Sequence, residues 1–190
     1  MNYRTFETGI PCGGRPPTHL PEHVGTNQEP WYSRSSIEFL ADNLDDSMEV
    51  LEYGCGSSTL WFAQRVKSVI AIEHVKTWAD EVTQLVPKSL ESKVDVVHIP
   101  NQEQGQYAGH GGRFYDNYLD KTFDMICVDG RCRAQSIINS MGSLKNNGLL
   151  LIDNAERGQY HAAISQLPRE WVRLDFPSPI TLTSIFKVSE

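Results

Sequence analysis

The segment EVLEYGCGSST, residues 49–59, places an apolar run directly before an acid and a glycine-rich turn. Glycines at 54 and 56 allow a tight turn and close approach to a ligand, and free amides at the start of the following helix favour a negative group. A second apolar run, Ser68–Glu73, ends in an acid at the distance where a βαβ unit places a ribose-binding carboxylate. The pattern predicts a nucleotide-type cofactor site; the alternative is a tight strand-to-helix turn that binds nothing.

The rest of the chain continues the alternation of strands and helices. Apolar spacing predicts helices beginning near Ser33 and covering 60–66, 78–86, 137–144 and 160–167, and strands at 94–99, 123–128 and 149–152. Asn147-Gly148 is expected to stop the fourth of these helices. Residues 1–30 hold five of the ten prolines and are expected to form an extended arm, either disordered or in contact with substrate. Residues 31–190 are expected to form one domain.

The C-terminal region departs from this alternation. Residues 171–176 and 182–188 are strand-like and joined by a link around Pro177 and Pro179. A parallel crossover needs about a dozen residues or more, so these strands must pair antiparallel. The sequence therefore predicts an α/β fold with a mainly parallel sheet that closes with a reversed hairpin.

The turn sequence Glu-Tyr-Gly-Cys-Gly-Ser-Ser-Thr resembles the first motif of class I S-adenosylmethionine-dependent methyltransferases, whose usual form is acid, any residue, Gly, any residue, Gly. A dinucleotide fingerprint would have a third small residue where Thr59 stands. The reversed hairpin is similar to the end of the same fold, so the resemblance covers residues 33–190. It implies a three-layer Rossmann-like fold with a seven-stranded sheet. It also implies methyl transfer to a small molecule, more readily at oxygen than at another atom.

Two other functions stay open at this point. One is a non-catalytic module that binds S-adenosylmethionine. The other is an NAD-dependent oxidoreductase, which the missing second mononucleotide-binding half disfavours.

The resemblance also assigns cofactor contacts. Gly54 and Gly56 would pass under the methionine part of the cofactor, and Glu73 would accept hydrogen bonds from both ribose hydroxyls. The full set of expected cofactor-binding residues is Glu52, Gly54, Gly56, Ser57, Ser58, Glu73, His74, Asn101 and Asp129.

Asp129 with Asp153-Asn154 resembles the metal-ligand set of catechol and caffeoyl-CoA type O-methyltransferases. Three hard oxygen ligands suit Mg²⁺, which could lower the pKa of a substrate hydroxyl. Cys132 stands where those enzymes have a catalytic lysine. The alternative is that Asp129 contacts cofactor or substrate directly and Asp153-Asn154 caps a loop.

The candidate catalytic residues are Asp129, Arg131 and His110. Arg131, Arg133 and Arg157 either clamp an anionic substrate or pair with nearby acids.

Composition and charge limit the classes of partner and the cellular location that we expect. A net charge of -7 and a pI near 5.4 disfavour a nucleic-acid substrate. The sequence lacks an apolar run of the roughly 20 residues that cross a bilayer, so no membrane association is expected. The expected state is a soluble, cytoplasmic protein in which Cys12, Cys55, Cys127 and Cys132 are free thiols, with homo-oligomerisation left open.

Overall fold

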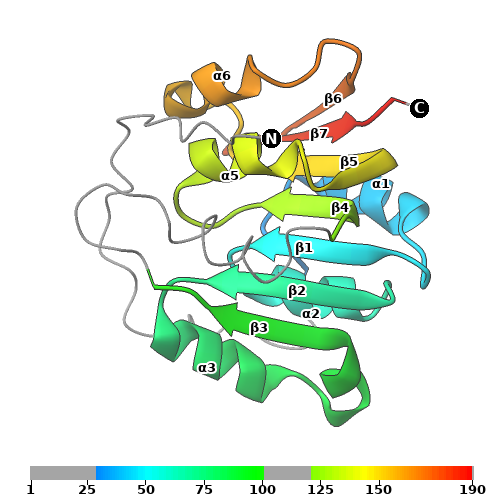
Figure 1. Cartoon of the computed structure of the whole chain (residues 1–190), viewed down its shortest axis with the longest axis vertical. Helices are drawn as coiled ribbons and strands as arrows, with labels where there is room; N and C mark the ends of the chain where they lie inside the picture. The colour runs from blue at the N-terminus through cyan, green and yellow to red at the C-terminus, as the bar shows by residue number, and fades with distance from the viewer. Residues whose placement is uncertain (1–28, 101–120, 190) are drawn as a thin grey trace.

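Seven strands form a single sheet in the computed structural model, in the order β3-β2-β1-β4-β5-β7-β6 (Figure 1). The structure describes residues 29–100 and 121–189. The strands are β1 (Glu49–Tyr53), β2 (Ser68–Glu73), β3 (Val94–His98), β4 (Phe123–Val128), β5 (Leu144–Ile152), β6 (Val172–Pro177) and β7 (Leu182–Lys187). Strands β1 to β5 pair in parallel, and β7 lies antiparallel between β5 and β6. The predicted fold class and the reversed hairpin are confirmed.

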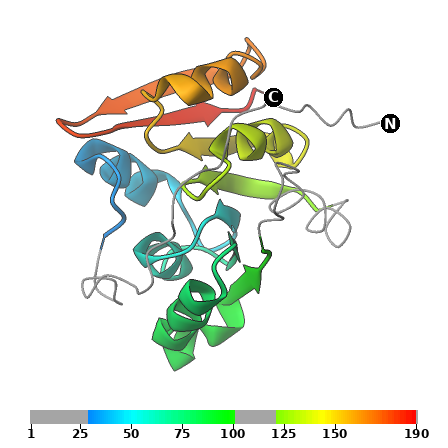
Figure 2. The same ribbon diagram turned by 90° about the vertical axis from the view of Figure 1, so that its left-hand side faces the viewer.

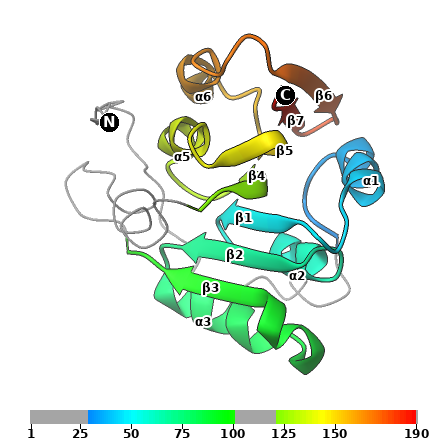
Figure 3. The ribbon, with the colours of Figure 1, turned by 45° about the vertical axis from the view of Figure 1, so that its right-hand side comes forward.

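The helices lie between the strands in the chain. They are α1 (Arg34–Asn43), α2 (Ser57–Ala63), α3 (Lys76–Leu85), the 3₁₀ helix η1 (Lys88–Lys93), α5 (Arg133–Ser140) and α6 (Gly158–Ile164). Helix α1 begins where predicted, because the Ser33 hydroxyl accepts a hydrogen bond from the Ser36 amide at 3.3 Å. Figure 1 shows α5 in front of the sheet and α2 behind it, and Figure 3 shows the same separation. The molecule is therefore layered as helices, sheet and helices.

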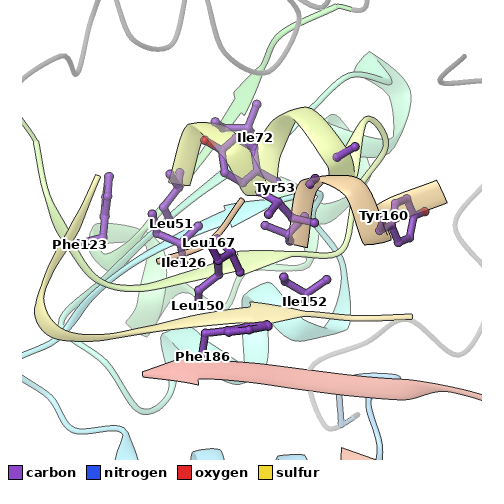
Figure 4. Packing of buried hydrophobic residues seen from close by; sticks show 14 of the residues in the cluster. Leu51, Tyr53, Ile72, Phe123, Ile126, Leu150, Ile152, Tyr160, Leu167 and Phe186 are labelled. Carbon is purple, nitrogen blue, oxygen red and sulfur yellow. The ribbon is translucent and has the colours of Figure 1, made fainter. Parts of the chain in front are cut away.

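Alternating side chains along each strand build one core on each face of the sheet. On β1, Leu51 and Tyr53 join the cluster that packs against α5 and α6, whereas Val50 joins the cluster under α1 and α2. Figure 4 shows the first cluster, with Ile126 and Leu150 beside Leu51. Because strand side chains alternate, a register slip of one residue would exchange the two faces. Burying one such aliphatic side chain stabilises the fold by about 1.5–3 kcal/mol.

The predicted boundary between the fourth helix and the next strand is wrong. Helix α5 ends at Ser140, and β5 already begins at Leu144, which pairs with Phe123 of β4. The register of this pair then shifts between Phe123 and Met125. Leu144 lies at a helical interval after Met141, so apolar spacing alone could not separate helix from strand here.

The carboxyl ends of β1, β2, β4 and β5 lie at one edge of the sheet, as parallel pairing requires. Figure 2 looks onto this edge. Glu52 and Glu73 lie at the ends of β1 and β2, and Asp129 and Asp153 directly follow β4 and β5, so the predicted site residues that the structure describes lie at this edge. In the described ranges no helix has the length and apolar character that crossing a membrane requires.

Candidate functional site

Gly54 lets β1 end against the turn that follows β4. Its φ is +103°, and a Cβ added there would lie 2.9 Å from the Cα and N of Gly130. A Cβ at Gly130 would in turn lie 2.8 Å from the Gly54 N. The Gly130 amide donates to the Tyr53 carbonyl at 2.5 Å. The close approach expected of Gly54 is therefore an approach to Gly130, and both positions exclude a side chain.

Gly56 has different surroundings in the same turn. A Cβ there would meet no atom within 4 Å. Its amide is not free for a ligand, because it donates to the Thr59 hydroxyl at 3.0 Å. The side of the turn that Gly56 faces is thus open space among the described residues. An open cradle of this kind fits a cofactor that passes along the turn.

The buried carboxyl of Glu52 is hydrogen-bonded on the inner side of the glycine-rich turn. Its carboxyl accepts a hydrogen bond from the Ser58 hydroxyl and another from the Thr59 hydroxyl at 2.5 Å, and only 1% of the residue is exposed. Burial raises the pKa of Glu52 to about 8, outweighing the two hydroxyl donors, with a smaller contribution from Asp129. Glu52, Ser58 and Thr59 therefore form one buried network, which fixes the shape of the turn.

The end of β2 holds a carboxylate in a fixed orientation. Glu73 Oε1 accepts from the backbone amides of His74 and Val75, both at 2.8 Å, and lies 2.7 Å from the His74 Nδ1. Its other oxygen, Oε2, lies 4.0 Å from the Cys55 Sγ. Burial opposes the charged form, but the His74 contacts prevail and lower the pKa of Glu73. Glu73 is therefore an ionised acceptor beside the glycine turn.

Arg133 connects the carboxyl ends of β4 and β5. Its guanidinium donates to the Asp129 carboxylate at 2.7 Å, to the Asn154 side-chain oxygen at 3.1 Å and to the Asp153 carbonyl at 2.5 Å. It also donates to the carbonyls of Gly130 and Asp129, at 2.9 and 2.7 Å. These contacts decide between the two roles considered for Arg133, because its guanidinium is bound to nearby acids.

The two aspartates of this cluster are partly desolvated. Burial raises the pKa of Asp129 to about 6; Arg133 opposes the shift, and nearby Asp153 adds to it. The pKa of Asp153 is also raised by burial, against the effect of Arg133. The Asp129 side chain is 30% exposed and that of Asp153 is 7% exposed. Asp129 is thus the more accessible carboxylate of the two, and burial raises its pKa to about 6.

The expected metal ligands do not form an open ligand set. Arg133 contacts Asp129, Asp153 and Asn154, and the second oxygen of Asp153 accepts from Thr181 and Thr183 at 3.2 and 3.1 Å. Across residues 29–100 and 121–189, no group of three or more His, Cys, Asp or Glu side chains could hold a metal ion. The donor set does not fit Mg²⁺, which needs several free oxygens in near-octahedral geometry.

Two of the remaining expected site residues, Ser57 and Arg131, lie near the same edge. Ser57 is buried at the start of α2. Arg131 is half-buried and makes no hydrogen bond or ion pair to a described residue. His110 and Asn101 lie outside the described residues, as do residues 1–28 of the arm expected over 1–30.

Cys132 corrects one expectation about the cysteines. It is disulfide-bonded, whereas Cys55 and Cys127 are free thiols as predicted. Its φ of 59° lies in the left-handed region and lets the chain turn from β4 into α5.

Sequence reasoning missed four contributors to the site. Gly130 is the partner of Gly54, and the hydroxyls of Thr59, Thr181 and Thr183 hold the buried carboxylates. Thr59 carried a usable signal, since a Thr three residues after Gly56 can reach back to that amide as a helix cap does. The other three contacts join segments far apart in the chain.

No protein-family model matches the sequence, and no curated protein sequence matches it either. Solved protein structures, in contrast, are similar to this chain in fold. The fold is similar to an rRNA methylase from Streptococcus thermophilus at a TM-score of 0.62 and 15% identity, over 82% of this chain and 95% of that chain. It is also similar to a Streptococcus mutans protein solved in complex with S-adenosylhomocysteine, at a TM-score of 0.60 and 12% identity, over 81% of this chain and 96% of that chain.

A third similar structure is an S-adenosylmethionine-dependent O-methyltransferase from Thermotoga maritima, at a TM-score of 0.57 and 15% identity, over 82% of this chain and 64% of that one. The chain therefore has the Rossmann-like fold of class I S-adenosylmethionine-dependent methyltransferases.

Proposed function

We propose that this protein is an S-adenosylmethionine-dependent methyltransferase that acts on a small molecule at oxygen. The observation that carries the proposal is the juxtaposition, at one sheet edge, of the open turn at Gly56, the ionised Glu73 and the accessible Asp129. In open α/β sheets, ligands bind at the carboxyl ends of the strands.

The cofactor is assigned to the β1 and β2 ends. Gly56 leaves room for the methionine part, and Glu73 Oε2 is the carboxylate oxygen left to accept ribose hydroxyls, since Oε1 already has its donors. Glu52, Ser58 and Thr59 keep the turn in shape from within. When bound, S-adenosylmethionine supplies an activated methyl group whose transfer returns the bonding electron pair to sulfur.

Asp129 is assigned as the group that receives the acceptor proton. A base works best when its pKa lies near the working pH, and burial brings that of Asp129 to about 6. With the cofactor bound, Asp129 would receive the proton that the acceptor hydroxyl gives up as its oxygen takes the methyl group. Arg133 holds the Asp129 carboxylate in place, because its guanidinium donates to one carboxylate oxygen at 2.7 Å.

Two arginines and the net charge together support an acidic acceptor of low molecular weight. Within residues 29–100 and 121–189, Arg131 is half-buried and forms no ion pair, and the Arg157 guanidinium forms a single ion pair, with Glu156 at 3.9 Å. Either guanidinium could bind a carboxylate or phosphate on the acceptor. The net charge of -7 argues against a long polyanion such as RNA.

The test is methyl transfer from labelled S-adenosylmethionine to a panel of small phenols, hydroxy acids and carboxylates, with ribosomal RNA as a further arm. We expect labelled product from a small hydroxyl acceptor, with a rate that rises with pH through about 6 as Asp129 loses its proton. Asp129→Asn should remove this rise and most of the rate while leaving cofactor binding intact. Labelling of RNA alone would contradict the proposed acceptor class, and product with an unchanged pH profile in Asp129→Asn would contradict the proposed base.

A further inference from the structure

The Arg133 guanidinium lies inside a cage of oxygen atoms. Five hydrogen bonds run from it to Asp129, Gly130, Asp153 and Asn154, over distances of 2.5–3.1 Å. The side chain is only 10% exposed. Two of the acceptors are the side-chain oxygens of Asp129 and Asn154, and the Asp153 carboxylate lies 3.7 Å away. All three residues of the expected metal-ligand set thus surround one organic cation.

We infer that Arg133 is the resident cation of the cluster formed by Asp129, Asp153 and Asn154, and that the cluster works without a divalent metal ion. The inference rests on the proposed function only where it places Asp129 beside the acceptor. Arg133 is a positioning residue in this account, because it acts through Asp129.

Charge balance explains why the cluster needs a cation. Two carboxylates at neighbouring strand ends repel each other, and burial makes their charged forms costly. Arg133 opposes the rise in pKa of both Asp129 and Asp153, and the two acids in turn raise its own pKa. A guanidinium is permanently protonated and planar, so it can satisfy several oxygens at once.

The same geometry disfavours a metal ion. Mg²⁺ binds oxygen at about 2.0–2.1 Å, so drawing the Asp129 Oδ1 and Asn154 Oδ1 atoms onto one ion would require it to replace the guanidinium that bonds to both. The guanidinium also donates to three backbone carbonyls. A metal ion that displaced it would break these hydrogen bonds and leave the positively charged Arg133 nearby. On the far side, Thr181 and Thr183 already occupy one Asp153 oxygen.

Thermal unfolding with and without metal tests the inference on the full chain. We expect millimolar Mg²⁺ or Mn²⁺ to leave the melting temperature of the unaltered protein unchanged, and EDTA to leave its affinity for S-adenosylhomocysteine unchanged. Arg133→Met, which keeps the side-chain bulk without charge, should melt lower at neutral pH. Its deficit should shrink at about pH 5, where the unpaired carboxylates take up protons.

Metal should then stabilise the variant where it did not stabilise the parent. Mg²⁺ should raise the melting temperature of Arg133→Met, and the double variant Arg133→Met with Asp153→Asn should lose that response. Arg133→Lys is the conservative control and should resemble the parent more closely. A purely structural role for Arg133 would produce no gain of metal response.

A rise in the parent's melting temperature on adding Mg²⁺, lost in Asp153→Asn, would overturn the inference, and this arm stands even if Arg133→Met does not fold. Failure of the inference leaves the binding of S-adenosylhomocysteine unaffected, whereas failure of the proposed function appears as loss of that binding in the parent.

Discussion

Gly54 and Gly56 lie in one turn, but their surroundings predict opposite effects of an added methyl group. Ala at position 54 would need a φ of +103° and would place its Cβ 2.9 Å from Gly130 backbone atoms. We expect Gly54→Ala to lower the free energy of unfolding by about 2 kcal/mol or more. Gly56→Ala should change it by less than about 0.5 kcal/mol, since its Cβ meets no atom.

Urea unfolding and calorimetry with S-adenosylhomocysteine separate the two effects. Gly56→Ala should weaken binding because its methyl group enters the space assigned to the cofactor, and Gly54→Ala should chiefly lose stability. Equal stability of the two variants would contradict the Gly54–Gly130 contact, and full binding by Gly56→Ala would contradict the cofactor path.

Glu52 should make stability depend on pH in an unusual direction. Its pKa is about 8 in the folded chain and near 4.5 in the unfolded chain, so the folded state binds the extra proton. The contribution is complete below about pH 4.5 and is lost as pH rises through about 8. Thermal melts should therefore show falling stability between about pH 6 and 8, above the range in which Asp129 titrates.

Glu52→Gln should flatten this dependence, because its amide can still bond to both hydroxyls without titrating. Asp129→Asn is the matched control and should leave the slope above about pH 6 in place. A slope that persists unchanged in Glu52→Gln would place its origin in another group.

At the scale of elements, the terminal hairpin does more than close the sheet. The β7 residue Thr183 donates to Asp153 at 3.1 Å and accepts from the Ser33 amide at 3.1 Å, so it joins the start of α1 to the end of β5. Thr183→Val keeps the shape but leaves both partners short of a hydrogen bond. We expect it to cost about 1–3 kcal/mol in the free energy of unfolding.

Thr77→Val is a suitable control, since Thr77 is exposed on α3. Chemical denaturation should show less than about 0.5 kcal/mol change for that control. If Thr183→Val changed the free energy of unfolding as little as Thr77→Val, the hydroxyl bridge between α1, β5 and β7 would not contribute to stability.

Elements with one dominant signal were predictable from sequence. Phe123–Val128 is apolar except for Asp124, and the link between residues 176 and 182 is too short for a parallel crossover. The 141–148 segment was not predictable in this way, because Leu144 satisfies a helical interval and a strand equally well. Its pairing with Phe123 decides the matter, and that contact is not visible in local spacing.

At the scale of the whole molecule, the position of the site could be predicted from the strand topology. The side-chain contacts within the site could not. Parallel strands bring their carboxyl ends to one edge, so Glu73, Asp129 and Asp153 could be placed there from the sequence. Which acid each arginine binds depends on side-chain geometry across β4 and β5. For that reason Arg133 was left with two possible roles, and the structure selects one.

The most direct test of the whole account is isothermal titration calorimetry of the intact chain with S-adenosylhomocysteine. We predict one binding site per chain, with affinity reduced at least about tenfold in Glu73→Ala by loss of the ribose hydrogen bonds. Asp80→Ala, at an exposed acid on α3, should bind like the parent. No measurable binding by the parent, or equal binding by Glu73→Ala, would contradict the cofactor site proposed at the ends of β1 and β2.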